Sequence, residues 1–172
     1  MTKVRGEDFE DMMNGGRQVQ RQKLSSSMRG FSLIELLIVV AVILIVAAIA
    51  IPNLLQAKMS ANESAAASSI HAINTAEIAY STANPLIGFS AALSDLGPGQ
   101  GGYIDSSLAS GVKSGYTFTY VPDSNVPSTS YTLNADPLTR GVTGRRSFWS
   151  SETNVTHYNG TGPATNLDNV IE

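Results

Sequence analysis

The side chains that most often carry catalysis or bind metals are scarce in this chain and far apart. Its 172 residues include two histidines, His71 and His157, and no cysteine. Thiol chemistry, a disulfide scaffold and cysteine-based metal sites are therefore excluded. The acidic residues after position 30 stand singly, so their spacing predicts neither a carboxylate pair nor a calcium loop. Without a nucleophile–base or metal constellation, we expect a protein that is not an enzyme and needs no cofactor or metal.

One short stretch does combine residue types in a suggestive way. Gly30 stands at a boundary between polar and apolar sequence, Phe31 follows it, and Glu35 lies five places after the glycine. The next residues, Leu36–Ile51, are 16 consecutive apolar side chains. A charge in the centre of a membrane-spanning helix costs about 2.5–3.5 kcal/mol. Near one end the cost is smaller, but we still expect Glu35 to have a partner.

The element that must position these residues is a membrane-spanning helix. Phe31–Ile51 comprises 21 residues, interrupted only by Ser32 and Glu35. As a helix it would be about 31 Å long, which matches the hydrocarbon core of a bilayer. Four cations precede it without an acidic residue after Gly15, namely Arg17, Arg21, Lys23 and Arg29. The positive-inside rule then places the N-terminus in the cytoplasm and the C-terminus outside.

The sequence Gly30-Phe31-Ser32-Leu33-Ile34-Glu35-Leu36, followed by the apolar run and Pro52, resembles the type IV pilins, including the pseudopilins of type II secretion. The resemblance covers about residues 29–61 and is only architectural beyond them. It implies that prepilin peptidase cleaves after Gly30 and methylates the new amine of Phe31. It also implies a homo-oligomeric helical filament assembled through Phe31, Glu35 and Pro52.

In such a filament, Glu35 of one subunit would pair with the Phe31 amine of its neighbour. The pairing would cancel two buried charges and fix the axial register. The chain departs from the family in two respects. Its leader of 30 residues is long, and Leu44 stands where several pilins have a glycine that helps the helix to melt. Pro52 removes a helical hydrogen bond and could supply that break alone.

Other interpretations of the apolar segment stay open. A secretory signal peptide would be cleaved after Ala48-Ile49-Ala50, although its basic region would be unusually long. A plain signal anchor explains the hydrophobicity but not the residues from Gly30 to Glu35. In that case Glu35 would simply reach toward the membrane interface.

The pattern after Pro52 predicts that the helix continues into an amphipathic half. Ala66, Ile70, Ile73, Ala76 or Glu77, and Tyr80 recur at intervals of three or four and form one stripe. Asn84-Pro85 ends the helix. We therefore divide the chain into four parts: a cytoplasmic leader (1–30), a transmembrane and filament-core helix (31–53), an amphipathic helix (54–84) and a head (85–172).

The head is predicted to be a small antiparallel sheet. Leu86–Gly115 is interpreted as a loop-like connection. Its glycine-rich part lacks the lysine of a phosphate-binding loop and is therefore interpreted as an ordinary loop. Strands are expected at 116–121, 130–135 and 146–150, with a weaker one at 155–158. Three or four strands packed on the helical stripe would give an α+β, pilin-like fold.

The function predicted from these features is a structural subunit of a type IV pilus or pilus-like filament. The major pseudopilins have an acidic C-terminal metal loop that Asp168 and Glu172 do not match, which favours a pilus over a type II secretion pseudopilus. A monomeric, signal-anchored binding protein is the alternative from another class. The expected partners are prepilin peptidase, the assembly machinery and the inner membrane, where the subunit resides before it enters the filament.

The charges of the head allow one further expectation. Residues 31–172 carry five basic and ten acidic side chains, so we expect no nucleic-acid partner. Arg145-Arg146 lies beside Phe148-Trp149 and is interpreted either as a binding patch or, with more weight, as a sheet edge or subunit contact.

Overall fold

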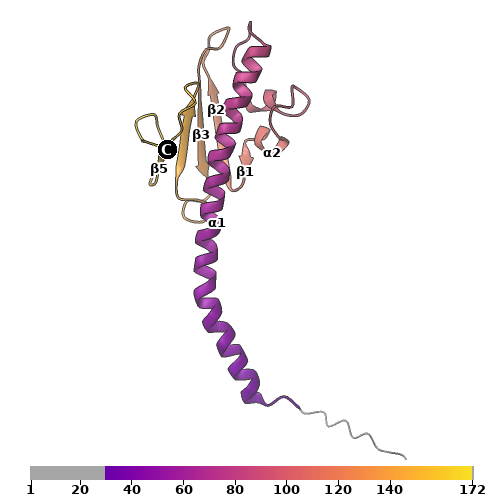
Figure 1. The fold of residues 1–172 in the computed structure, drawn as a ribbon, viewed down its shortest axis with the longest axis vertical. Coiled ribbons are helices and arrows are strands. Elements are labelled where there is room, and N and C mark those ends of the chain that lie inside the picture. The colour runs from indigo at the N-terminus through magenta and orange to yellow at the C-terminus, as the bar shows by residue number, and fades with distance from the viewer. Residues whose placement is uncertain (1–29, 172) are drawn as a thin grey trace, which may run out of the picture. The chain divides into compact units, whose positions relative to one another are not determined.

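A computed structural model of the chain describes residues 30–171. The leader, apart from Gly30, lies outside the described residues, and so does Glu172. The long helix α1 runs over Leu33–Ala83 without interruption and stops directly before Asn84-Pro85 (Figure 1). Residues from Val42 onward form one compact unit. The continuous helix predicted on both sides of Pro52 is confirmed, whereas the division into the parts 31–53 and 54–84 stays a prediction.

The head contains an antiparallel sheet that follows the order of the sequence. Its strands are β1 (Val112–Lys113), β2 (Tyr116–Pro122), β3 (Tyr131–Pro137), β4 (Ser147–Ser151), β5 (His157–Asn159) and β6 (Asn169–Val170). Each strand pairs with the next one in the chain, as in Phe118↔Ala135 and Ala135↔Phe148. Between β1 and β2, Ser114 and Gly115 both have positive φ angles, which is the geometry of a tight hairpin.

The prediction of three or four strands is wrong in number. The described residues form six, because β1 and β6 were not anticipated. Two-residue strands are too short to show an alternating pattern in sequence. The other four strands were located, with ends shifted by one or two residues.

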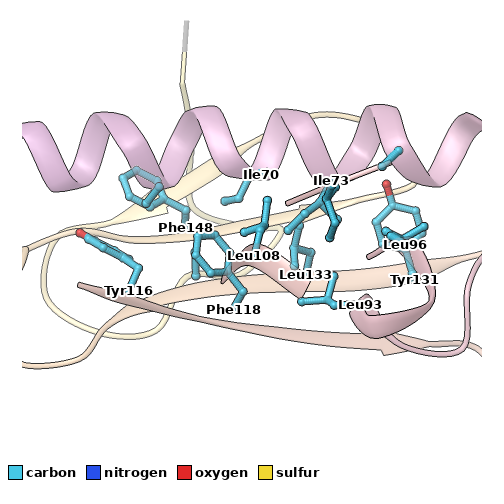
Figure 2. Packing of buried hydrophobic residues seen from close by; sticks show 14 residues of the cluster. Ile70, Ile73, Leu93, Leu96, Leu108, Tyr116, Phe118, Tyr131, Leu133 and Phe148 are labelled. Carbon is cyan, nitrogen blue, oxygen red and sulfur yellow. The ribbon is translucent and has the colours of Figure 1, made fainter. Parts of the chain in front are cut away.

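The hydrophobic core lies between α1 and one face of the sheet. Figure 2 shows Ile70 and Ile73 of the helix directed toward Leu133 and Phe148 of the sheet. All four side chains are fully buried. The predicted α+β, pilin-like arrangement of one long N-terminal helix on a small sheet is therefore confirmed.

The interpretation of Leu86–Gly115 as a loop is also wrong in part. The segment contains the short helices η1 (Leu93–Leu96) and α2 (Ser106–Ala109), and both contribute to the core. Leu93, Leu96 and Leu108 are buried. The Asp105 carboxylate caps α2 by accepting a hydrogen bond from the Leu108 amide at 3.0 Å. A single helical turn does not reveal a period, so these apolar residues look isolated in sequence.

Candidate functional site

The apolar part of α1 has no protein surface to pack on in the described part of the chain. Every large apolar side chain from Phe31 to Leu55 is exposed, with fractions from 46% at Val40 to 81% at Leu33. By length and composition, α1 is the one helix among residues 30–171 that could cross a membrane. Such a surface requires lipid or another apolar helix to cover it.

Gly30 and Phe31 lie just before the first turn of α1. A Cβ atom built on Gly30 would meet nothing within 4 Å, and its φ angle is not in the left-handed region. Neither packing nor backbone strain within the described residues therefore explains a glycine at this position. The Phe31 side chain is 76% exposed.

Glu35 occupies the first turn of α1, where the helix dipole favours a negative charge. Its side chain is exposed, and within residues 30–171 it makes no hydrogen bond or ion pair. Pro52 lies inside α1, which continues through it. The helix break proposed at Pro52 is thus not a feature of the single chain. The roles predicted for Gly30, Phe31, Glu35 and Pro52 stay predictions.

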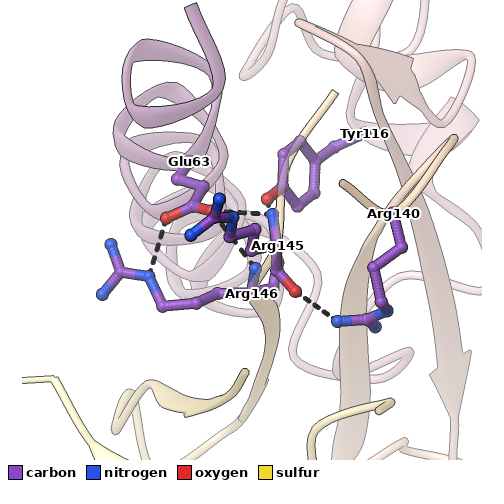
Figure 3. Close-up of polar contacts among 5 residues, drawn as sticks. All are labelled: Glu63, Tyr116, Arg140, Arg145 and Arg146. Carbon is purple, nitrogen blue, oxygen red and sulfur yellow. Dashed lines mark hydrogen bonds and ion pairs between the residues drawn. The ribbon is translucent and has the colours of Figure 1, made fainter. Parts of the chain in front are cut away.

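A second group of polar side chains, which the sequence did not reveal as a site, holds the head to α1 (Figure 3). Glu63 is 8% exposed, and its Oε1 atom accepts hydrogen bonds from the backbone amides of Arg145 (2.8 Å) and Arg146 (3.2 Å). Its Oε2 atom accepts one from Nε of Arg146 at 2.8 Å. Burial acts to raise the pKa of Glu63, but these donors outweigh burial and hold the pKa below its usual value.

The residues around Glu63 fix Arg146 in place. The Arg146 guanidinium lies 5.7 Å from the centre of the Phe148 ring and 5.4 Å from that of Tyr158, within range of cation–π attraction. The Tyr116 hydroxyl donates to the Arg146 carbonyl at 2.8 Å. A Cβ atom on Gly144 would lie 2.0 Å from the same hydroxyl, which explains the glycine.

This arrangement corrects the interpretation of Arg146 as part of a binding patch and of the pair as a sheet edge, whereas the subunit contact stays a prediction. Arg146 serves as an internal anchor rather than as part of a binding patch with Phe148, which is fully buried. The pair directly precedes β4, which lies between β3 and β5 in the sheet, and is therefore not at a sheet edge. The Arg145 side chain is exposed and makes no hydrogen bond or ion pair in the part of the chain that the structure describes.

Further along α1, two polar residues are buried completely. Asn74 donates to Ser150 Oγ and Asn154 Oδ1, each at 2.9 Å, and accepts from the Tyr131 hydroxyl at 2.9 Å. Glu77 accepts hydrogen bonds from the backbone amide and hydroxyl of Ser90. Burial raises the pKa of Glu77 despite these donors. Polar residues at positions of an otherwise apolar stripe were the available signal for both anchors.

The two histidines do not form a metal centre. His71 is exposed on α1, whereas His157 is half-buried and its Nδ1 atom lies 2.8 Å from the Asp168 carbonyl. Among residues 30–171, no group of three or more His, Cys, Asp or Glu side chains is placed to hold a metal ion. The Asp168 carboxylate instead accepts hydrogen bonds from Asn159 and Thr165.

Comparison with known proteins identifies the N-terminal segment. Residues 25–51 match the family model described as the prokaryotic N-terminal methylation motif. This motif is the signature of type IV pilins and pseudopilins, so the resemblance inferred from the sequence is confirmed. The motif indicates a structural subunit rather than an enzyme. No curated protein and no solved structure matches the chain.

Proposed function

We propose that this protein is a structural subunit of a type IV pilus or a pilus-like filament. The observations that carry the proposal are the match of residues 25–51 to the methylation motif and the exposure of every large apolar side chain from Phe31 to Leu55. In the membrane, lipid would cover these side chains. In a filament, the same segments of other copies would replace the lipid, so one surface serves both states.

Maturation would take place at the start of α1. Prepilin peptidase would cleave between Gly30 and Phe31 and methylate the new amine of Phe31. The open space around Gly30 supports this role, because a glycine that the fold does not need is explained by an enzyme that must reach the backbone.

Assembly would pair the Phe31 amine of one subunit with the Glu35 carboxylate of another. The absence of a partner for Glu35 within residues 30–171 leaves the carboxylate free for this contact. In an apolar bundle, two opposite charges are tolerated only when they meet. The pair would therefore fix the axial position of one subunit relative to the next.

A pilus is favoured over a type II secretion pseudopilus by the C-terminal region. The Asp168 carboxylate is already engaged by Asn159 and Thr165 and does not belong to an acidic cluster in residues 30–171. A type II secretion pseudopilin stays one alternative, and the alternative from another class is a monomeric, signal-anchored binding protein. It predicts an intact N-terminus and no filament.

Processing is tested by the N-terminus of the protein in the membrane fraction and in sheared filaments. We expect a chain that begins with N-methylated Phe31, as measured by mass spectrometry. Gly30→Val should accumulate as the full-length precursor. An intact Met1 in filaments, or cleavage after Ala50, would contradict the proposal.

Assembly is tested by Glu35→Leu. The variant should insert and be processed normally, because the helix becomes more apolar and the cleaved bond precedes Glu35. It should fail to form filaments, since losing one partner of a buried charge pair costs about 3–5 kcal/mol. Glu35→Gln should be milder, because its amide oxygen still accepts a hydrogen bond.

The matched control is Ser32→Leu, which removes the other polar residue of the same segment without removing a charge. Filaments counted by electron microscopy should be retained in this control and lost in Glu35→Leu, at equal membrane levels of mature subunit. A normal filament yield from Glu35→Leu would exclude charge pairing as the assembly mechanism.

A further inference from the structure

The loop between β3 and β4 brings distant cations to the point where α1 leaves the head. Residues 31–172 contain five basic side chains, and Arg140, Arg145 and Arg146 all lie in or beside this loop. The Asn62 amide donates to the Thr143 carbonyl at 2.8 Å, which fixes the loop against α1. Lys58 lies one helical turn before Asn62 and so shares its face. We call this surface, formed by Lys58 and residues 138–146, the head base.

The head base combines positive charge with exposed apolar side chains. Leu138 is 56% exposed and Val142 60% exposed, although both lie in a loop. The acidic residues nearby are Glu63, which is engaged by Arg146, and Asp136, which is half-buried on β3. With four basic and two acidic side chains, the head base has a net positive charge. Leu138 and Val142 add exposed apolar side chains to it. That combination is typical of segments that lie in the headgroup layer of a membrane.

The position of the head base along α1 determines how far it lies from a bilayer that surrounds the apolar run. The exposed apolar run ends at Leu55, and Asn62, which holds the loop, follows seven residues later. Seven helical residues span about 10 Å. A headgroup layer is about 5–7 Å thick, and the Debye length is about 8 Å at physiological salt. A bilayer around the residues up to Leu55 therefore places its phosphates within electrostatic reach of the head base.

We propose that the head base binds the phosphates of anionic phospholipids and so docks the head on the bilayer before assembly. The proposal rests on the membrane insertion of α1 that forms part of the proposed function. Lys58 and Arg145 would contact phosphates, since both side chains are exposed, while Val142 would enter the headgroup layer. Arg140 and Arg146 mainly hold the loop, through contacts with Ser147 and Glu63.

The absence of natural cysteines allows a direct test with the full-length chain reconstituted in vesicles. Val142→Cys carries an environment-sensitive fluorophore on the head base. Val126→Cys is the matched control, because this valine is 87% exposed in the loop between β2 and β3, which lies at the opposite end of both strands. Quenching by lipids with a spin-labelled headgroup measures proximity to the bilayer surface.

We expect the Val142 label to be quenched several-fold more than the Val126 label, and more strongly in phosphatidylglycerol-containing vesicles than in phosphatidylcholine alone. Lys58→Gln combined with Arg145→Gln should abolish the dependence on anionic lipid. Equal quenching at both positions, or equal quenching in both lipids, would overturn the proposal. A Val142 signal that disappears when the protein is diluted in lipid would assign the surface to a second copy instead and would also overturn it.

A third label separates this proposal from the proposed function. Ile45→Cys lies in the apolar run and should be quenched by a lipid labelled deep in its acyl chain. If Ile45 is quenched but Val142 is not, only the docking of the head base fails. If Ile45 is not quenched, α1 is not inserted, and both proposals fail.

Discussion

Two stretches of the same helix have opposite environments. From Phe31 to Leu55 every large apolar side chain is exposed, whereas from Met59 to Glu77 one face is buried against the head. The buried face carries Glu63, Asn74 and Glu77 among its apolar residues, and each of these polar groups has a partner in the head. Within residues 30–171 the first stretch therefore has no partner, whereas the second stretch has its partner in the head.

The largest effect is expected when the first stretch is removed. Deletion of residues 1–55 should convert a membrane protein into a soluble, folded head, because the remaining part of α1 still covers the sheet. The chain contains no cysteine, so no disulfide is needed. Circular dichroism and amide hydrogen exchange on the purified fragment measure this. A disordered fragment would show that the two-layer head depends on the apolar segment.

Single truncations in the two stretches should differ by several kcal/mol. Ile73 is fully buried, so Ile73→Ala should lower the free energy of unfolding of the head by about 2–5 kcal/mol. Leu44 is 63% exposed, and Leu44→Ala should change it by less than about 0.5 kcal/mol. Denaturant unfolding of the full chain in detergent, followed by Trp149 fluorescence, compares the two variants. Equal losses of unfolding free energy in the two variants would contradict the distinction between an exposed and a buried stretch of α1.

The polar anchor at Glu63 should contribute less than the apolar core. Glu63→Ala leaves the Arg145 and Arg146 amides without their acceptor, at a cost of about 1–3 kcal/mol. The ion pair itself adds little, since the Arg146 side chain is 42% exposed. Because the folded-state pKa of Glu63 is lowered, its contribution is present above the unfolded pKa of about 4.3 and is lost as the pH falls through the folded pKa.

Unfolding measurements at pH 7 and pH 3 should therefore show a larger effect of Glu63→Ala at pH 7. Glu152→Ala serves as the control, because Glu152 is exposed and accepts only a long hydrogen bond of 3.4 Å. An effect of Glu63→Ala that does not change with pH would mean that the carboxylate charge has no role in the anchor.

The smallest effect is expected at Glu77, and its dependence on pH has the opposite sign. Burial raises the folded-state pKa of Glu77, so its contribution is complete below the unfolded pKa and is lost as the pH rises through the folded value. Glu77→Gln should therefore destabilise the head more at pH 4 than at pH 7. Asp95 also acts to raise this pKa, so Asp95→Asn should reduce the difference between the two pH values. The same denaturation series tests this, and a larger loss at pH 7 would contradict the assignment.

Much of the fold was predictable, because long periodic elements reveal themselves locally. The α1 stripe through Ile70 and Ile73 and the alternation in β2 each repeat a period several times. The contact between Glu63 and Arg146 was not predictable, because the two residues are 83 positions apart and neither is unusual in its own neighbourhood. The apolar residues of η1 and α2 were missed for the same reason, since their burial depends on contacts made elsewhere in the chain.

The same limit applies to the candidate site. Gly30, Phe31 and Glu35 were singled out because they form a contiguous sequence pattern that resembles a known family, and they lie within the matched residues 25–51. Their roles stay predictions. The head base could not be found in this way. Its cations come from two segments about 85 positions apart, and only the closure of the β3–β4 loop onto Asn62 brings them together.

The short outer strands of the sheet affect how heads interact when they lie close together. β1 and β6 are each two residues long, whereas the inner strands β2 and β3 have seven. Free strand edges are templates on which neighbouring molecules fuse into aggregates, and short edges offer little to extend. Heads that lie side by side should therefore stay separate and not join into a continuous β-sheet.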